Sequence, residues 1–336
     1  MVSMTAGKPN PASAPWLVAD IGGTHARFGL IDGPARSVAR VQRLRAAEHA
    51  SLIDAVRAYL ASLPLSFLAP SRACFAVAAP LEGDAVVFTN SHWSFLRSKL
   101  RSELGLDQLQ VLNDFEALAL ALPRLGADGL RAHGVMPRPH GSLAVVGPGT
   151  GLGVAGLIET ATGWCAIPGE GGHATLSAAD DFEAAVLAAA RCELEHVSAE
   201  RLLSGLGLPL LHRAVGVASG RRVDVEAPSA EVIVKRGSDG SDAGCALTLS
   251  VFCAMLGSFA GNVALTLGAR GGLYIGGGIV PRIADLFFTS AFRERFEAKG
   301  RYRAYLQAIP TALILDPQAA LLGAALALEQ TGTAST

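Results

Sequence analysis

The stretch QVLNDFEAL, residues 110–118, decides the fold of this 336-residue chain. A short apolar run stops at Asn113 and Asp114, and an alanine- and leucine-rich pattern with helical spacing follows directly. The sequence therefore predicts a strand that passes into a helix, which is where α/β proteins place their chemistry. The alternative is that one of the two polar residues only caps the helix, with its side-chain oxygen accepting a backbone N–H.

A first glycine-rich loop lies upstream. Residues 16–19 and 28–31 read as two short strands, and the segment DIGGTHAR, residues 20–27, joins them as a hairpin. Consecutive glycines let the backbone approach an anion, and successive N–H groups can bind a phosphate. Thr24 could add a hydroxyl, and Asp20 at the strand end would face Mg²⁺ through water. The alternative is an ordinary Gly-Gly turn with no ligand.

A second loop repeats this layout. The strand predicted at residues 143–146 enters GPGTGLG, residues 147–153, and an extended segment follows at 154–158. The loop fits neither the Walker pattern nor G-x-G-x-x-G. Two glycine hairpins that carry threonine, one in each half of the chain, indicate two similar lobes that close on a nucleotide. A third turn, GGGIVP at residues 276–281, would suit a flat adenine and its ribose.

Glu170 and His173 lie in the segment IPGEGGH, residues 167–173. Their spacing matches a di-metal helix motif, but the surrounding glycines disfavour a helix there. A loop that presents a carboxylate and an imidazole to hydroxyl groups is therefore preferred over a metal site. Glu200 falls in a helix predicted at residues 193–203, and the alternative for it is that it complements the helix dipole.

The remaining pattern predicts an α/β protein that is long enough for two domains. Helices are expected at residues 43–61, 228–235, 247–267 and 318–328, and further strands at residues 73–78, 85–89, 273–275 and 312–315. The helix at 247–267 is rich in small residues, with Gly257 and Gly261 spaced for close packing, and it permits a homodimer.

Composition narrows the class of protein. Half of the residues are hydrophobic, 17% are charged and the net charge is −1, so no nucleic-acid surface is indicated. The five cysteines are widely spaced and form no C-x-x-C pair, which favours free thiols in a reducing compartment. Residues 1–15 read as a disordered tail without a secretory signal, and the apolar stretch at 319–328 is too short for a membrane span. A cytoplasmic protein follows by elimination.

The motifs together resemble those of bacterial ATP-dependent glucokinases. The match rests on DIGGTHAR from residue 20, LNDFEA from 112, GPGTGLG from 147, PGEGGH from 168, HVSAERLLSG from 196 and GGGIVPR from 276. They occur in the family's order and span most of the chain. The resemblance implies the two-domain actin-like ATPase (ribonuclease-H-like) α/β fold with an interdomain cleft. The small domain would comprise residues 16–124 and 316–333, and the large domain residues 125–315.

The resemblance also implies residue roles. Asp114 would be the catalytic base for the glucose 6-hydroxyl, and Asn113, Glu170, His173 and Glu200 would bind the sugar beside it. The expected ligands are ATP, Mg²⁺ and D-glucose, with no nucleic acid, no membrane and a homodimer as the assembly. The positions expected to bind the nucleotide are Ala19, Asp20, Ile21, Gly22, Gly23, Thr24, Gly149, Thr150, Gly151, Gly276 and Gly277, with Asp20 holding Mg²⁺ through water.

Two residues depart from the family pattern. His25 stands where asparagine is usual, and it adds a group that titrates near neutrality. Pro148 replaces a small residue and removes one N–H donor. Two other classes share the fold: sugar-sensing repressors of the related ROK group, and phosphatases or chaperone ATPases that hydrolyse ATP. The first would need a helix-turn-helix before Trp16 and a cysteine-rich zinc motif, and the sugar loop at 168–173 argues against the second.

Overall fold

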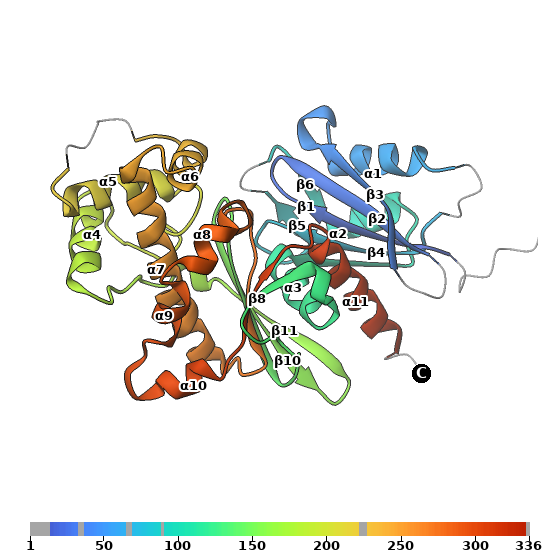
Figure 1. Cartoon of the computed structure of the whole chain (residues 1–336). Coiled ribbons are helices and arrows are strands. Elements are labelled where there is room, and N and C mark those ends of the chain that lie inside the picture. The colour runs from blue at the N-terminus through green and yellow to red at the C-terminus, as the bar shows by residue number, and fades with distance from the viewer. Residues whose placement is uncertain (1–13, 33–36, 65–68, 89–90, 222–226, 334–336) are drawn as a thin grey trace, which may run out of the picture. The chain divides into compact units, whose positions relative to one another are not determined.

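The computed structural model describes residues 14–32, 37–64, 69–88, 91–221 and 227–333, so most of the tail expected at residues 1–15 lies outside it. The chain divides into two compact units (Figure 1). Unit 1 comprises residues 1–124 and 317–336, and unit 2 comprises residues 125–316. Each unit is built around its own sheet.

Unit 1 contains a five-stranded sheet in the order β3-β2-β1-β4-β7. β1, β2 and β3 form an antiparallel meander, whereas β4 and β7 run parallel to β1. β1 and β4 are almost wholly buried, as expected for strands covered on both faces. The bounds are β1 Trp16–Ile21, β2 His25–Asp32, β3 Ser37–Arg45, β4 Arg72–Val77 and β7 Gln108–Asn113, with a separate pair, β5 Ala85–Val87 and β6 Ser94–Leu96.

Unit 1 contains helices from the first part of the chain and one helix, α11, from its C-terminal part. α11 lies beside α3 and against β4 (Figure 1), and a Cβ added to Gly323 would collide with the carbonyl oxygen of Ala117. Only glycine permits this close approach of the two helices. The bounds are α1 Leu52–Ala61, α2 Arg97–Glu103, α3 Asp114–Ala121 and α11 Ala319–Thr333, with 3₁₀ turns at Ala46–Glu48 and Leu122–Arg124.

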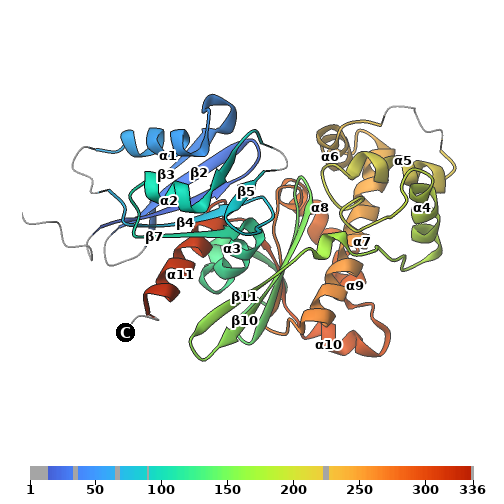
Figure 2. The same ribbon diagram turned by 180° about the vertical axis from the view of Figure 1, so that it is seen from behind.

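Unit 2 contains a six-stranded sheet in the order β11-β10-β9-β12-β13-β8. β10 and β11 form a long hairpin at one edge (Figure 2), and β12 runs parallel to β9 and β13. The bounds are β8 Leu130–His133, β9 Ser142–Pro148, β10 Leu152–Thr160, β11 Gly163–Gly169, β12 Gly272–Ile275 and β13 Thr311–Ile314.

The core of unit 2 forms around α7, Ala243–Leu267, which is the long helix expected from the sequence. By length and composition it could cross a membrane, but 72% of its apolar window is buried inside the unit, as in a core helix. The other helices are α4 Asp181–Arg191, α5 Leu208–Ala218, α6 Ala230–Ser238, α8 Ala284–Thr289, α9 Phe292–Glu297 and α10 Arg303–Gln307, with 3₁₀ turns at Ala127–Gly129, Gly171–His173, Val280–Ile283 and Gly300–Tyr302.

The small-residue face of α7 packs inside unit 2. A Cβ on Gly257 would meet the carbonyl oxygen of Phe292, and one on Gly261 would come within 2.6 Å of the carbonyl oxygen of Phe296. Both partners lie on α9. The expected close packing is therefore present, but α9 already covers this face, so α7 gives no support to a homodimer.

Two sequence predictions are wrong. The first half of the helix expected at residues 43–61 belongs to β3 and a 3₁₀ turn, and α1 begins only at Leu52. The region expected to be helical at 193–203 consists of turns. Its backbone N–H groups bond to another segment: Ala199 donates to Ala174 and Glu200 to Gly172, at 2.9 and 2.8 Å. The dipole explanation for Glu200 therefore no longer applies.

Candidate active site

At the junction of β7 and α3, Asn113 and Asp114 lie at the start of the helix, as the sequence predicts. Asn113 is the N-cap: its Oδ1 accepts the backbone N–H of Phe115 at 2.9 Å, and Glu116 Oε2 accepts the N–H of Asn113 at 3.4 Å. This capping box fixes the turn on which Asp114 stands. The capping alternative is thus true of Asn113. The cap bond uses its side-chain oxygen and not the N–H groups of its amide.

Asp114 is the first residue of α3, and its Oδ1 also accepts the N–H of Phe115, at 3.0 Å. A carboxylate in the first turn is stabilised by the positive end of the helix. Burial raises the pKa of the neighbouring Glu116, and its bond from Asn113 offsets part of that rise. Asp114 and Glu116 thus both lie in the first turn of α3.

The first glycine loop of unit 1 is the turn of the β1–β2 hairpin. Ile21 and Ala26 are paired at its base, and Gly22 donates to the carbonyl oxygen of His25 at 2.9 Å. Neither Gly22 nor Gly23 has a positive φ, so the turn itself does not require glycine at either position. Missing side chains at such positions serve close approach of a ligand to the backbone.

Asp20 lies directly opposite Arg27 across the hairpin. The Arg27 Nη1 donates to Asp20 Oδ2 at 3.0 Å and to the carbonyl oxygen of Pro317 at 2.6 Å. Burial raises the pKa of Asp20, and the guanidinium opposes that rise. Sequence reasoning missed Arg27, although its place at the same level of the two strands is the spacing that pairs opposite charges across a sheet.

The carboxylate of Asp20 is compatible with Mg²⁺ held through water. Mg²⁺ keeps several waters and takes one or two carboxylates in addition to substrate phosphates. Within the described ranges, no group of three or more potential metal-ligating residues is present, so these residues form no all-protein cage. A single carboxylate at the end of a strand, as Asp20 provides, agrees with that mode of binding.

His25 follows the glycines, and its Nδ1 lies 3.0 Å from Arg43 Nη2. Because arginine can only donate, Nδ1 is the acceptor and the proton of the neutral ring is on Nε2. Burial and the charges of Arg43, Arg45 and Arg27 lower the pKa of His25, against a smaller opposing effect of Glu48. The titration expected near neutrality therefore moves to more acidic pH.

In unit 2 the second glycine loop and the triple-glycine turn lie together. Gly149 donates to the carbonyl oxygen of Gly151 at 2.8 Å, which closes the β9–β10 turn. Ile279 donates to the carbonyl oxygen of Pro148 at 3.2 Å. Gly277 has φ +77°, and a Cβ there would collide with that same oxygen. Both the backbone angle and the space at Gly277 thus require glycine.

Pro148 agrees with this arrangement. It ends β9 opposite Leu152, and its carbonyl oxygen accepts the bond from Ile279. Gly205, which sequence reasoning gave no role, donates to the carbonyl oxygen of Gly149 at 2.8 Å. Segments on two sides therefore bond to the residues of this turn. Pro148 takes part through its carbonyl oxygen, so the N–H that proline lacks is not needed for this contact.

Glu200 joins this loop to the candidate sugar residues. Its Oε2 accepts the backbone N–H of Leu152 at 2.8 Å, and its Oε1 lies 3.8 Å from His173 Nε2. A Cβ on Gly151 would collide with Oε2, so the glycine makes room for the carboxylate. The structure thus brings together Glu200, His173 and the glycine turn within unit 2.

Glu170 and His173 lie on a short turn that follows β11. Residues 167–169 of the expected loop belong to the end of β11, and Gly171–His173 form one 3₁₀ turn with Glu170 as its N-cap residue. Both side chains are exposed, and the His173 N–H donates to the carbonyl oxygen of Glu170 at 3.0 Å. Neither belongs to a metal-ligating group among the residues that the structure describes.

Comparison with known proteins identifies relatives over nearly the full length. A family model described as Glucokinase matches residues 17–331. A glucokinase of Aromatoleum aromaticum is 50% identical, covering 95% of this chain and 97% of that protein. One of Chromobacterium violaceum is 49% identical, covering 94% and 89%. The crystal structure of a glucokinase from an Antarctic psychrotroph superposes with a TM-score of 0.86 at 38% identity, covering 94% of this chain and 98% of that one.

Proposed function

This chain belongs to the glucokinase family, and we propose how its residues carry out the reaction of that family. It is an ATP-dependent hexose kinase that transfers the γ-phosphoryl group of ATP to the 6-hydroxyl of D-glucose, giving glucose 6-phosphate and ADP. The observation that carries the assignment of roles is the contact of Glu200 with both the glycine turn and His173.

Asp114 is the general base in this proposal. Phosphoryl transfer passes through a loose transition state, so the enzyme acts mainly by positioning and by stabilising charge. The carboxylate of Asp114 accepts a hydrogen bond from the 6-hydroxyl, orients its oxygen toward the γ-phosphorus and takes its proton as the new P–O bond forms. Its place on a capped helix start keeps that carboxylate ordered.

Four residues bind the sugar. The amide of Asn113 donates to a hydroxyl with its N–H groups, because its oxygen is occupied by the cap. Glu170, His173 and Glu200 accept from or donate to further hydroxyls. A hydroxyl that is missing or inverted leaves such groups unpaired, which is the physical basis of sugar selectivity.

The glycine turns bind ATP. The turns within residues 19–24 and 149–151 lie against the phosphates. The N–H groups of Gly22 and Gly149 are already bonded within the turns, so these two glycines act by letting the phosphates approach the backbone. Gly276 and Gly277 allow the adenosine to lie flat on the backbone. Mg²⁺, when bound, neutralises charge on the phosphates. Asp20 would hold one of its waters with the oxygen that does not face Arg27.

A substrate screen tests the proposal. The protein is offered glucose, fructose, mannose and N-acetylmannosamine with ATP, and product ADP is measured in a coupled assay. Phosphorylation of glucose above the others supports the assignment, whereas ADP release that does not depend on any sugar indicates a hydrolase. Replacement of ATP by polyphosphate in the same assay identifies the phosphate donor, and a helix-turn-helix repressor would give no product at all.

The setting of the enzyme is also part of the proposal. The free cysteines favour a reducing compartment such as the cytoplasm, where the product would enter glycolysis. The homodimer expected from the sequence loses its argument from α7, because α9 covers that face. Analytical ultracentrifugation of the purified protein measures the assembly directly.

A further inference from the structure

A cavity lies in unit 2, at the end of its sheet opposite the glycine turns. Its volume is ≈ 680 Å³, within the range of small-molecule sites. Three segments line it: the loop before β9, the loop before β12 and the start of α10 with the residues after it. Gly271 precedes β12 and Gly276 follows it. The cavity is therefore roughly 15 Å along the strand from the triple-glycine turn that is proposed to bind adenosine.

Positive charge gathers on this cavity. Arg138, His140 and Arg270 line it, and its lining contains no Asp or Glu among the described residues. In the part of the chain that the structure describes, neither Arg138 nor Arg270 forms an ion pair, whereas Arg213 and Arg293 each contact a glutamate. Two exposed arginines without a carboxylate partner among the described residues thus line one cavity, and guanidinium groups are suited to bind an anion.

The carboxylate beside this region is already bonded. Glu159 Oε2 accepts the backbone N–H of Gly141 at 2.8 Å, and its own N–H donates to the carbonyl oxygen of Gly141 at 2.8 Å. His140 Nδ1 lies 2.7 Å from the carbonyl oxygen of Arg138, which tightens the same loop. These contacts shape the loop without neutralising either arginine.

The rest of the lining is apolar and aromatic. Val135, Met136, Ile309 and Pro310 contribute to it, and Val135 is 76% exposed. The Arg270 guanidinium lies over the ring of Tyr305, 5.9 Å from its centroid. An apolar wall with one aromatic ring favours a ligand whose body is itself flat or apolar.

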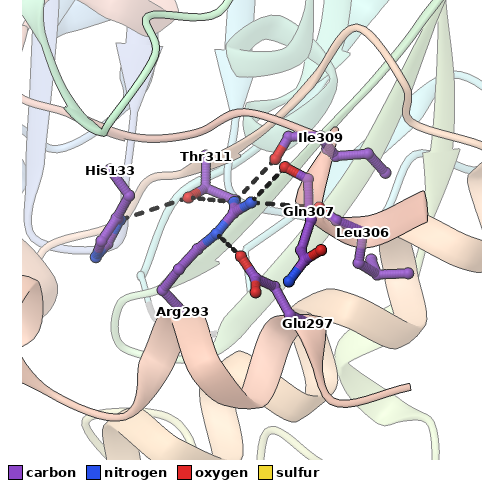
Figure 3. A network of polar contacts seen from close by, with 7 residues as sticks. All are labelled: His133, Arg293, Glu297, Leu306, Gln307, Ile309 and Thr311. Carbon is purple, nitrogen blue, oxygen red and sulfur yellow. Dashed lines mark hydrogen bonds and ion pairs between the residues drawn. The ribbon is translucent and has the colours of Figure 1, made fainter. Parts of the chain in front are cut away.

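Arg293 bonds to the backbone of the segment that contributes Ile309 to the lining (Figure 3). Its guanidinium donates to the carbonyl oxygens of Ile309, Gln307 and Leu306 at 2.8, 3.0 and 3.3 Å, and its Nε donates to Glu297 at 2.6 Å. A segment fixed by so many bonds is preorganised, so binding costs little ordering there.

We propose that this cavity binds a small organic phosphate with a flat or apolar body, independently of the catalytic residues. The phosphate is recognised by Arg138 and Arg270, and the body lies against Tyr305 and the apolar wall. Nothing in the reaction uses these residues, and all of them belong to unit 2. The site is therefore separate from the glycine turns.

Calorimetric titration with phenyl phosphate tests the proposal. The full-length protein is first saturated with glucose and a non-hydrolysable ATP analogue, so that the catalytic site is filled. Phenyl phosphate is then expected to bind with one saturable site, inorganic phosphate more weakly, and phenol not at all. The double variant R138Q/R270Q is expected to lose about tenfold or more in affinity, because both charged donors to the phosphate are removed.

Two further variants separate the causes. R57Q/R191Q removes the same charge from exposed positions outside the cavity and is expected to bind as the wild type does. Tyr305→Leu should weaken phenyl phosphate but not inorganic phosphate. Equal affinity of R138Q/R270Q and wild type, the absence of saturable binding, or binding of phenol alone would each overturn the proposal.

Discussion

The Glu200 Oε2 accepts the backbone N–H of Leu152 at 2.8 Å, directly after the turn of residues 149–151. The other oxygen of this carboxylate lies 3.8 Å from His173 Nε2. One side chain therefore contacts a proposed phosphate loop and a proposed sugar residue. A change at Glu200 is expected to affect both substrates together.

Glu200→Ala is expected to raise KM for ATP and for glucose by roughly tenfold each, since a charge-assisted bond worth ~1.5–3 kcal/mol is lost. Glu200→Gln keeps an acceptor for Leu152 and should restore KM for ATP more than KM for glucose. Steady-state kinetics measure both constants. Glu195→Ala, at an exposed position nearby, serves as the control. An increase confined to glucose in Glu200→Ala would show that the bond to Leu152 has no part in ATP binding.

Asp114→Ala is expected to retain glucose binding but to lose turnover by about 10²–10⁴-fold, the usual contribution of a general base. Glucose affinity is measured by calorimetry and kcat by the coupled assay. Asp107→Ala, which removes an exposed carboxylate from the start of the same β–α segment, should keep wild-type activity. If Asp114→Ala turned over near the wild-type rate, Asp114 would have no place in the mechanism.

His25 is expected to make KM for ATP depend on pH only on the acidic side. Burial and the neighbouring arginines lower the pKa of His25, so the ring gains its charge at more acidic pH than an ordinary histidine does. The added positive charge beside the phosphate loop should lower KM for ATP. His25→Asn, which restores the residue usual in the family, is the control and should remove the change. An identical pH profile in both proteins would exclude His25 as its source.

His133 is expected to destabilise the folded protein in acid. It packs against the rings of Phe287, Phe288 and Phe292, and burial with the charges of Arg293 and Arg131 lowers its pKa to about 4, from an ordinary 6.5. Because the unfolded chain binds this proton more readily, stability is complete above 6.5 and falls as the pH decreases toward 4.

Urea unfolding at a series of pH values measures this effect. His133→Gln lacks the titrating ring, so its free energy of unfolding should change less than that of the wild type over the same interval. The comparison concerns the slope with pH, because the substitution also changes the packing at every pH. Parallel curves for the two proteins would contradict a lowered pKa at His133.

Gly323→Ala is expected to destabilise unit 1 by about 1–3 kcal/mol, because the new methyl group collides with the carbonyl oxygen of Ala117 on α3. Since α3 begins at Asp114, a displaced helix should also lower kcat. Thermal unfolding and kinetics measure the two effects. Gly126→Ala is the control, since nothing lies within 4 Å of a Cβ there. A melting temperature equal to that of the wild type would mean that the two helices can separate at no cost.

Local patterns predicted part of the fold. The apolar run before Asn113 and the helical spacing after Asp114 gave β7 and α3, and the glycine hairpins were found between the strands expected for them. The helix prediction for residues 43–45 was wrong because β3 is a half-exposed edge strand, and its arginines obscure the alternation of apolar and polar residues. Such a strand is specified by its partner β2 rather than by its own composition.

The site shows the same division. Motif chemistry proposes the glycines, Glu170 and His173 as site residues, whereas the contact of Glu200 with Leu152 joins two segments 48 positions apart in the sequence. Residues 193–203 resemble a helix because Val197, Ala199, Leu202 and Leu203 are buried in the core of unit 2. Their spacing reflects packing in the core. The segment is instead bonded to residues 172–176: Ala199 and Glu200 donate to Ala174 and Gly172, and Leu176 donates to the carbonyl oxygen of Val197. No local pattern contains that information.

The close packing of Gly323 against Ala117 has a consequence for biosynthesis. A ribosome completes β1, β4, β7 and α3 long before it reaches α11, and during that interval one face of the first sheet and the back of the helix carrying Asp114 have no cover. The nascent chain must therefore shelter this surface, or be sheltered by a chaperone, while the whole of unit 2 is translated. Translation pausing inside unit 2 would lengthen the exposure and favour aggregation over activity.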